Sequence, residues 1–470
     1  MPRSASRLLK SAACQRIVWR ACARASWVLL MMVMVSYGLC AQNYSWDARS
    51  VGMGGATGVG EGNLASALVP PERRYTSIVI PLGLVQVFSN LEVFDPNDPG
   101  FDALRAIDYA GNPFHYSFNR PSRQGNVDFL KNIVDSGFSQ DLNAYRGFAP
   151  PEHLVAGGLM APSWGYTFKF YRGGNQSFQG IYVGAGPYIS LQTDLRFDPQ
   201  LIAILASPVP VTVPANSNFF ATNSAGQQAA VAITGGYRAK VPFQSATSAR
   251  DGVYLSVNVS YLIGLRHDAA DLNLQIATDS SGLVTLAPLQ VPLTMDHLSS
   301  RSGRGLTIDW GLVVVRRGWE AGLGINGVAN RMDWRDPRSK RFTLTNLSTG
   351  VDFVESALPV PTGDLQIELP VQYVANLGYH TGPWTLRSDW SYDLQKLGAR
   401  AGGEYRAGPV AFRGGVRYGT QTWNPTGGIG LNLTRRFGID VGLFGNTVNL
   451  EQRRNLSVAL SLRIESRSEL

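Results

Sequence analysis

The stretch Leu456-Ser457-Val458-Ala459-Leu460-Ser461-Leu462-Arg463-Ile464-Glu465 alternates aliphatic residues with small, polar or charged ones. A period of two places the aliphatic side chains on one face of a β-strand and the others on the opposite face. The stretch has roughly the 10 residues of a tilted strand that crosses a membrane. A strand of a soluble sandwich would show the same period, so the rest of the chain must decide between the two.

The same alternation recurs in about fourteen segments along the chain. This recurrence favours a transmembrane antiparallel β-barrel, because half of each strand in such a barrel faces lipid and half faces a polar interior. We expect strands near 75–88, 163–172, 179–194, 230–239, 253–265, 304–316, 318–330, 369–380, 383–393, 398–406, 409–419, 426–435, 438–447 and 455–464.

The connections between the expected strands alternate in length. Short or moderate ones, such as 173–178 and 436–437, are expected at one end of the barrel. Bacterial barrels have short periplasmic turns and long extracellular loops, and an even number of strands returns the chain to the periplasm. The long loops are expected at 89–162, 195–229, 266–303 and 331–368.

The composition agrees with a barrel. Charged residues make up 16% of the 470 residues, against about 25% in globular domains. The chain contains 51 glycines, and its mean hydropathy is −0.05. A helical membrane protein would be more apolar, whereas a barrel interior is polar.

Residues 1–41 have the pattern of a secretory signal peptide: a basic region without acidic residues is followed by the apolar run 27–39. Removal of its six basic residues lowers the net charge from +8 to +2, which leaves no basis for nucleic-acid binding. The cysteines are Cys14, Cys22 and Cys40, so no disulfide framework or cysteine metal site is expected in the mature chain.

The first long connection has two segments of helical periodicity, 99–110 and 126–138. The second segment carries an amphipathic stripe. It would either pack over the barrel mouth as a loop helix or form an apolar patch that captures an apolar ligand. The candidates for capture are Phe129, Leu130, Ile133 and Val134.

Asp47-Ala48-Arg49-Ser50-Val51-Gly52-Met53-Gly54-Gly55-Ala56 resembles the start of mature FadL-type outer-membrane proteins. That superfamily includes transporters of long-chain fatty acids and aromatic hydrocarbons, and barrels that serve secretion or conjugation machinery. The resemblance implies a fourteen-stranded barrel at 73–470 and an N-terminal plug at 42–72 that enters the lumen. The plug residues would be Arg49, Gly52, Met53, Gly54 and Gly55, whose glycines let backbone pass close to backbone.

Charged residues fall on the expected inner face of several strands. They would either select solutes and hold a ligand head group, or pair with one another and anchor the plug. These lumen charges are Arg387, Asp389, Arg413, Arg417 and Arg463, together with Asp309, Asp393 and Asp440.

No other motif carries specific chemistry. The acidic stretch 95–102 reads as a turn rather than a calcium loop, because Pro99 stands where a calcium ligand is needed. The five histidines form no metal pair, and no Gly-x-Ser-x-Gly or phosphate-binding loop is present. We therefore expect no catalytic residues, no metal and no cofactor, and a protein that is not an enzyme.

The sequence predicts an outer-membrane barrel that takes up hydrophobic small molecules passively through a plugged lumen. A structural or secretion-associated barrel that binds partner proteins is the alternative, and a general porin is a weaker third. The expected partners are outer-membrane lipid, an apolar ligand and the barrel-assembly machinery, and nucleic acid is not among them.

Overall fold

The computed structural model describes residues 47–465 except 57–62, 71–74, 96–97, 112–113, 126, 129–140, 147–151, 161–163, 174–176, 247, 285–293, 347–351, 358–363, 369–370, 394–395, 420–421, 435 and 447–452. The expected signal peptide lies outside the described residues. The helices are α2 (Ala48–Gly52), η1 (Ser66–Leu68), α3 (Leu82–Ser89), η2 (Leu91–Phe94), α4 (Ala103–Gly111), η3 (Leu142–Tyr145) and α6 (Pro199–Ala206).

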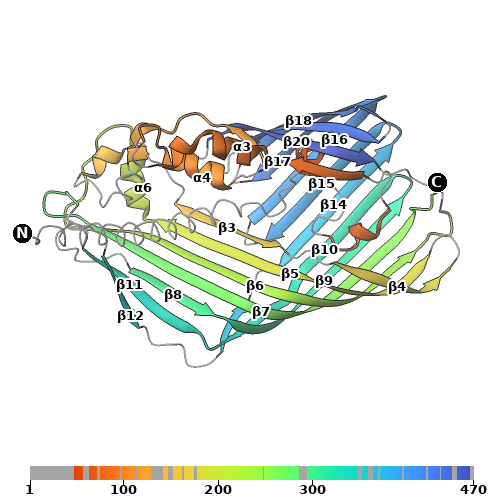
Figure 1. Cartoon of the computed structure of the whole chain (residues 1–470), viewed down its shortest axis with the longest axis horizontal. Coiled ribbons are helices and arrows are strands. Elements are labelled where there is room, and N and C mark those ends of the chain that lie inside the picture. Colours follow the sequence, from red (N-terminus) through yellow and green to blue (C-terminus); the bar gives the residue numbers. More distant parts are fainter. Residues whose placement is uncertain are drawn as a thin grey trace, which may run out of the picture.

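Strands dominate the described residues (Figure 1). They are β1 (Tyr75–Ile80), β2 (Tyr116–Phe118), β3 (His153–Met160), β4 (Trp164–Arg172), β5 (Phe178–Phe197), β6 (Asn218–Val241), β7 (Gly252–Ala277), β8 (Thr294–Ser300), β9 (Ser302–Arg316), β10 (Trp319–Arg335), β11 (Arg338–Asn346), β12 (Asp352–Ala357), β13 (Leu365–Glu368), β14 (Gln372–Thr381), β15 (Trp384–Asp393), β16 (Lys396–Ala407), β17 (Val410–Gly419), β18 (Thr422–Asn432), β19 (Phe437–Asn446) and β20 (Asn455–Glu465).

Within the described residues, these twenty strands form a single antiparallel sheet that makes the barrel wall. The ladder runs from β20 back through β14, continues through β10, β9, β7, β6 and β5, and ends at β3 and β4. Three strands, β8, β11 and β12, are additions outside this ring. The remaining seventeen occupy fourteen positions, because β1 and β2 share a position along β20, β3 and β4 share one along β5, and β13 and β14 share one along β10. The prediction of an antiparallel barrel of about fourteen strands is confirmed.

The two faces of the wall differ as the alternation predicts. On β20, Ser457, Ala459, Ser461 and Arg463 are buried in the interior, while Leu456 and Leu462 are exposed on the outside. The same division holds on β18, where Ile429 is 52% exposed and its cross-strand partners Phe412 and Val441 are also exposed. This continuous apolar outer face matches a lipid bilayer, and the protein is an outer-membrane β-barrel.

Helices play little part in the wall. Among the described residues, no helix is long and apolar enough to cross a membrane.

Several expected strands have different bounds in the structure, among them the first strand and the strand expected at 426–435. The strand expected at 75–88 ends at Ile80, because Pro81 cannot donate a ladder hydrogen bond and the apolar run after it forms helix α3. The strand expected at 426–435 is β18, which begins at Thr422 and ends at Asn432.

The long extracellular connections contain more regular structure than the sequence suggests. Strands β6 and β7 have 24 and 26 residues, about twice what is needed to cross the membrane. Their outer halves pair with each other, and β8, β11 and β12 extend the sheet further. Much of the segments 195–229, 266–303 and 331–368 therefore forms an extracellular sheet, at the lower left of Figure 1.

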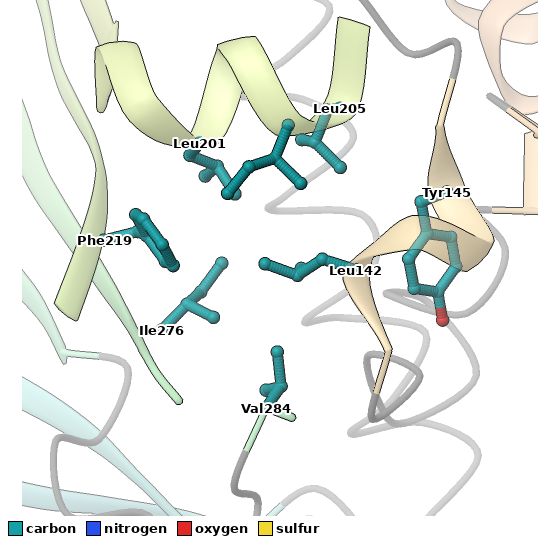
Figure 2. Packing of buried hydrophobic residues seen from close by; sticks show 8 residues of the cluster. Leu142, Tyr145, Leu201, Leu205, Phe219, Ile276 and Val284 are labelled. Atoms are coloured by element: carbon teal, nitrogen blue, oxygen red, sulfur yellow. The ribbon is translucent and has the colours of Figure 1, made fainter. Parts of the chain in front are cut away.

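A separate apolar core holds one side of this extracellular part together. Leu201 and Leu205 of α6 and Leu142 of η3 pack against Phe219 of β6 and Ile276 of β7 (Figure 2). Asp198 caps α6 by accepting hydrogen bonds from the backbone of the first turn. The run 199–206, which is apolar on average, is therefore buried against the sheet and does not face solvent.

We expect a charge on the outer face of the wall to destabilise the barrel. Ile429→Arg should lower the free energy of unfolding by about 1–3 kcal/mol, because the guanidinium would face hydrocarbon three residues from the periplasmic end of β18. The measurement is equilibrium unfolding by guanidinium in phospholipid bilayers. The control is Val209→Arg, at a site that is 60% exposed after α6, where the change should be small. Equal stability of Ile429→Arg and wild type would contradict the assigned lipid face.

We also expect pH dependence in the extracellular sheet. Two 2.6 Å hydrogen bonds from Arg341 on β11 hold the pKa of Asp296 on β8 below its usual range. A depressed carboxyl pKa adds stability above the unfolded value of about 3.9 and loses it as the pH falls through the folded value. The Tm difference between wild type and Arg341→Gln should therefore be present at pH 7 and shrink below about pH 4. A difference that is the same at both pH values would mean that this ion pair does not stabilise the sheet.

Candidate functional site: the plugged interior

The N-terminal segment 47–69, here called the plug, lies inside the barrel. Its helix α2 rests on the inner face of β16 to β19 at four glycines. A Cβ at Gly415 would lie 2.6 Å from the Met53 carbonyl carbon, and one at Gly442 would lie 2.6 Å from the Ala48 carbonyl oxygen. Gly402 and Gly428 complete this seat. They pair across the ladder with Gly415 and Gly442 respectively, so the helix backbone contacts the strand backbone directly.

Both ends of α2 are fixed by local hydrogen bonds. At the start, Asp47 accepts from the Ser50 backbone N–H at 3.2 Å and from the Ser461 hydroxyl at 3.0 Å. The Ser77 hydroxyl donates to the same carboxylate, so Asp47 joins the plug to both β20 and β1. At the end, Gly54 and Gly55 have φ of +75° and +83°, and Gly55 N–H donates back to Ser50 O at 2.8 Å. This is the glycine C-cap that a left-handed backbone requires.

A buried carboxylate ties the plug to the wall. Glu404 on β16 accepts two hydrogen bonds from Arg49, at 2.9 and 3.0 Å. It also accepts from Arg406 at 2.6 Å and from Arg413 at 2.7 Å. Its side chain is fully buried, and Arg49 is only 12% exposed. Such a charge is tolerated in the interior only because opposite charges surround it.

The charge network continues from Arg413 across two more strands. Arg413 lies 2.8 Å from Asp440 on β19, and Asp440 lies 3.3 Å from Arg463 on β20. Arg463 also donates to the Asn432 side chain at 2.6 Å. All three ionic side chains are at most 2% exposed. The network therefore forms a continuous polar layer on the inner wall beneath α2.

The far end of the plug contacts the opposite wall. Asn63 donates to the Asn376 side chain on β14 at 3.1 Å and to the Leu312 carbonyl on β9 at 3.4 Å. Ala65 and Val69 pack against Tyr254 and the β9 valines Val313 and Val315. Because the two ends of the plug contact different walls, the segment crosses the interior from β16–β20 to β7, β9 and β14.

The remaining predicted lumen charges occupy distinct places. Arg417 donates to the Gly445 carbonyl at 3.1 Å and lies over the Phe444 ring. Arg387 lies 3.1 Å from His380, and Asp309 accepts from the Gly327 backbone at 2.9 Å. Asp389 and Asp393 lie on β15. Among the described residues, the lumen charges lie in two groups, one beneath α2 and one on the wall strands β9 and β15.

The predicted capture residues Phe129, Leu130, Ile133 and Val134 lie outside the described residues. Of that expected helix, Val127 is buried. The expected helix at 99–110 corresponds to α4, which packs through Ala106 and Tyr109 against Val93.

Further toward the extracellular end, the interior becomes apolar. Trp334 and Met332 at the outer part of β10 pack with Tyr188, Leu262 and two alanines of β6. The Trp334 ring N–H donates to the Gln228 side chain at 3.0 Å, and the ring stacks on His267. Gly322, which adjoins Asn63, pairs with Val313 of β9, and Met332 pairs with Gly305, eight residues away on that strand. The apolar cluster therefore lies roughly 25 Å along the wall from the plug.

Several residues that shape the site were not singled out from the sequence. Glu404 binds an arginine 355 positions away, and Asn63 binds an asparagine 313 positions away. The four seat glycines did leave a signal, since each stands at an inward position of a consecutive strand. Inward glycines on adjacent strands indicate that another backbone approaches the wall there.

Comparisons with known proteins give structural likenesses only. No protein-family model and no curated protein sequence matches the chain. The CymD monoaromatic hydrocarbon channel is similar in structure, at 12% identity over 73% of this chain and 97% of that one, with a TM-score of 0.29. A TodX deltaS2S3 mutant monoaromatic hydrocarbon channel is similar at 12% identity over 73% and 95%, with a TM-score of 0.29. A mutant Rhodopseudomonas blastica porin is similar at 8% identity over 67% and 100%, with a TM-score of 0.24.

We expect Glu404 to be essential for holding the plug. Glu404→Ala should lower the free energy of unfolding by about 3–5 kcal/mol, because it leaves Arg49 buried without its anion and takes one of two anions from Arg413. The control is Glu355→Ala, which removes an exposed pair with Lys340 (48% and 52% exposed) and should cost about 0–1 kcal/mol. Both are measured by denaturant unfolding in the same bilayers. Equal effects of the two substitutions would contradict a plug held by this carboxylate.

Proposed function

We propose that this protein is a gated outer-membrane channel for small apolar molecules, in which the plug is the gate. One observation carries the proposal: apolar side chains around Trp334 and Met332 are packed together in the interior, on the extracellular side of a segment that crosses the lumen. Most inward positions of such a barrel are polar, so an apolar zone inside it is suited to a ligand that leaves water.

The contacts of the plug suit a gate. α2 has only five residues. Apart from a small apolar contact of Ala48 and Val51 with Phe444 and Ala459, it meets the wall through glycine backbone and polar groups. When such a segment moves, water or a shifted side chain can replace its neutral hydrogen bonds at a small net cost, and Arg406 and Arg413 still donate to Glu404. A large buried apolar interface would be harder to open, since its separation exposes hydrophobic area.

The route that follows has three parts. An apolar molecule is taken up at the extracellular end, lies against the Trp334 cluster, and leaves toward the periplasm when the plug moves. The glycines Gly52, Gly54 and Gly55 give the plug the freedom to change its backbone conformation. Capture by Phe129, Leu130, Ile133 and Val134 stays a prediction, as does folding by the barrel-assembly machinery. The division into a plug at 42–72 and a barrel at 73–470 is part of the same proposal.

A second function is favoured by a different observation. The plug is held at both ends, by Glu404 and Asp47 at one and by Asn63 at the other. A segment anchored so firmly would suit a non-conducting barrel whose extracellular sheet binds partner proteins. In that case the interior network serves stability alone. That the protein is not an enzyme also stays a prediction.

Tethering the plug decides between the two functions. The side-chain oxygens of Asp47 and Ser461 are 3.0 Å apart, and the Asn63 side-chain nitrogen lies 3.1 Å from the Asn376 side-chain oxygen. A cysteine pair at either place is therefore within reach of a short thiol linker that reduction can cleave. If the plug is the gate, cross-linking should reduce uptake of a labelled sixteen-carbon fatty acid and of labelled toluene by about tenfold or more, a barrier increase of about 1.4 kcal/mol. Uptake is measured in cells that produce each variant, before and after reduction.

The four single-cysteine variants are the controls, since they carry the same substitutions without a tether. Uptake that is restored by reduction supports the gate. If reduced protein takes up both tracers and neither tether changes the rate of uptake, the proposal that the plug is the gate is wrong. If reduced and wild-type protein take up neither tracer above the level of cells without the protein, the non-conducting function is favoured.

A further inference from the structure

The first strand of the barrel wall is split into two pieces. β1 pairs with β20 from Tyr75↔Glu465 to Ile80↔Leu460. β2 continues along the same partner in the same direction, from Tyr116↔Val458 to Phe118↔Leu456. Only Ala459 separates the two pairings along β20. The chain between Ile80 and Tyr116 therefore leaves the wall, forms α3, η2 and α4, and returns to nearly the same height.

The chain leaves the wall and enters helix α3 at a level where the outer face of the wall is apolar. Leu460 marks the departure, and the outward residues of the wall remain apolar beyond it, with Leu456 49% and Phe118 55% exposed. Antiparallel partners project to the same side of a sheet, so Phe118 faces outward with Leu456. The beginning of α3 is therefore within the apolar band and not above it.

The faces of α3 are inverted relative to a helix of a water-soluble protein. Its polar Gln86 is 3% exposed and Gly83 is buried. Leu84, Val85 and Phe88 are exposed, by 42%, 58% and 72%. A surface helix in water buries its apolar stripe and exposes its polar one. An arrangement with the polar side inside and the apolar side outside is suited to a lipid environment.

Gln86 takes the place of a missing strand neighbour. Among the described residues, β2 pairs with β20 alone, which leaves the backbone of its other edge without a strand partner. The Gln86 amide donates to the Ser117 carbonyl at 2.7 Å and accepts from the Ser117 N–H at 2.9 Å. In hydrocarbon an unpaired backbone group costs several kcal/mol, so a sheet edge there needs such a partner.

We propose that helix α3 is a membrane-embedded part of the barrel wall, and that Leu84, Val85 and Phe88 contact the acyl chains of the outer leaflet. The lipid-facing surface of β20 and β2 continues onto this helix face, and the first charged residue after it is Glu92, which is exposed. The helix thus shields the edge of β2 as a neighbouring strand would elsewhere in the wall. This proposal does not depend on transport by the barrel.

Spin labels test the proposal directly. All cysteines of the chain lie within residues 1–40, so the protein without its leader offers single labelling sites. Val85→Cys and Phe88→Cys are labelled in phosphatidylcholine vesicles, and collisions with oxygen and with a water-soluble nickel chelate are compared by electron paramagnetic resonance. Leu456→Cys is the lipid reference, and Val209→Cys, 60% exposed in the extracellular part, is the water reference.

Labels at 85 and 88 should behave like the label at 456, with frequent oxygen and rare nickel collisions. Behaviour like that of 209 would overturn the proposal, and would leave the exposed face for an apolar ligand or a protein partner. Because a label can disturb the helix, Phe88→Arg provides an independent measurement. It should raise the unfolding equilibrium constant in bilayers about fivefold or more, since an arginine on the lipid face is disfavoured even in the outer half of the bilayer. An unchanged constant would also overturn the proposal.

Discussion

The structure depends on one constraint: a backbone N–H or C=O that faces hydrocarbon must have a hydrogen-bond partner. The antiparallel ladder meets this constraint over most of the wall and fixes the side-chain parity of every strand. Parity then determines which residues face lipid and which face the interior, as on β20. Beside β2, which among the described residues pairs with β20 alone, the Gln86 side chain supplies such a pair of hydrogen bonds to Ser117.

The interior follows from the wall. Where the backbone of α2 lies, the inward residues of β16 to β19 are glycines. Where the side chains of α2 end, the inward residues of the wall are charged. Glycine permits the close approach of α2, and Glu404 makes the approach specific, because only a cation at the position of Arg49 completes its shell of arginines. Close packing and buried charge thus act on the same five-residue helix. The apolar cluster around Trp334 belongs to another zone, where the strands widen into the extracellular part.

Much of the fold could be predicted, because alternation in a lipid-facing strand reflects local physics. Strands such as β15, β17 and β20 have bounds within a residue or two of the expected ones. The outer halves of β6 and β7 could not be found in this way, since both of their faces are polar or covered by other chain segments. Helix α3 was missed because an apolar run of eight residues fits a strand or a helix equally well. In the candidate site, the plug was located from the stretch 47–56, but the partners of Arg49 and Asn63 depend on strand register, which a single sequence does not contain.

The split first strand also bears on how a barrel strand is defined. Two chain segments, 75–80 and 116–118, pair with one continuous strand, β20, and a single residue of β20 lies between the two pairings. What the wall requires at this position is an unbroken row of hydrogen bonds, and the covalent chain between the segments is free to be elsewhere. A barrel can therefore acquire a new element in mid-wall by insertion, without shifting the register of any strand. The excursion from Ile80 to Tyr116 is such an addition, and it marks a place where foreign sequence could be grafted into the wall itself instead of its loops.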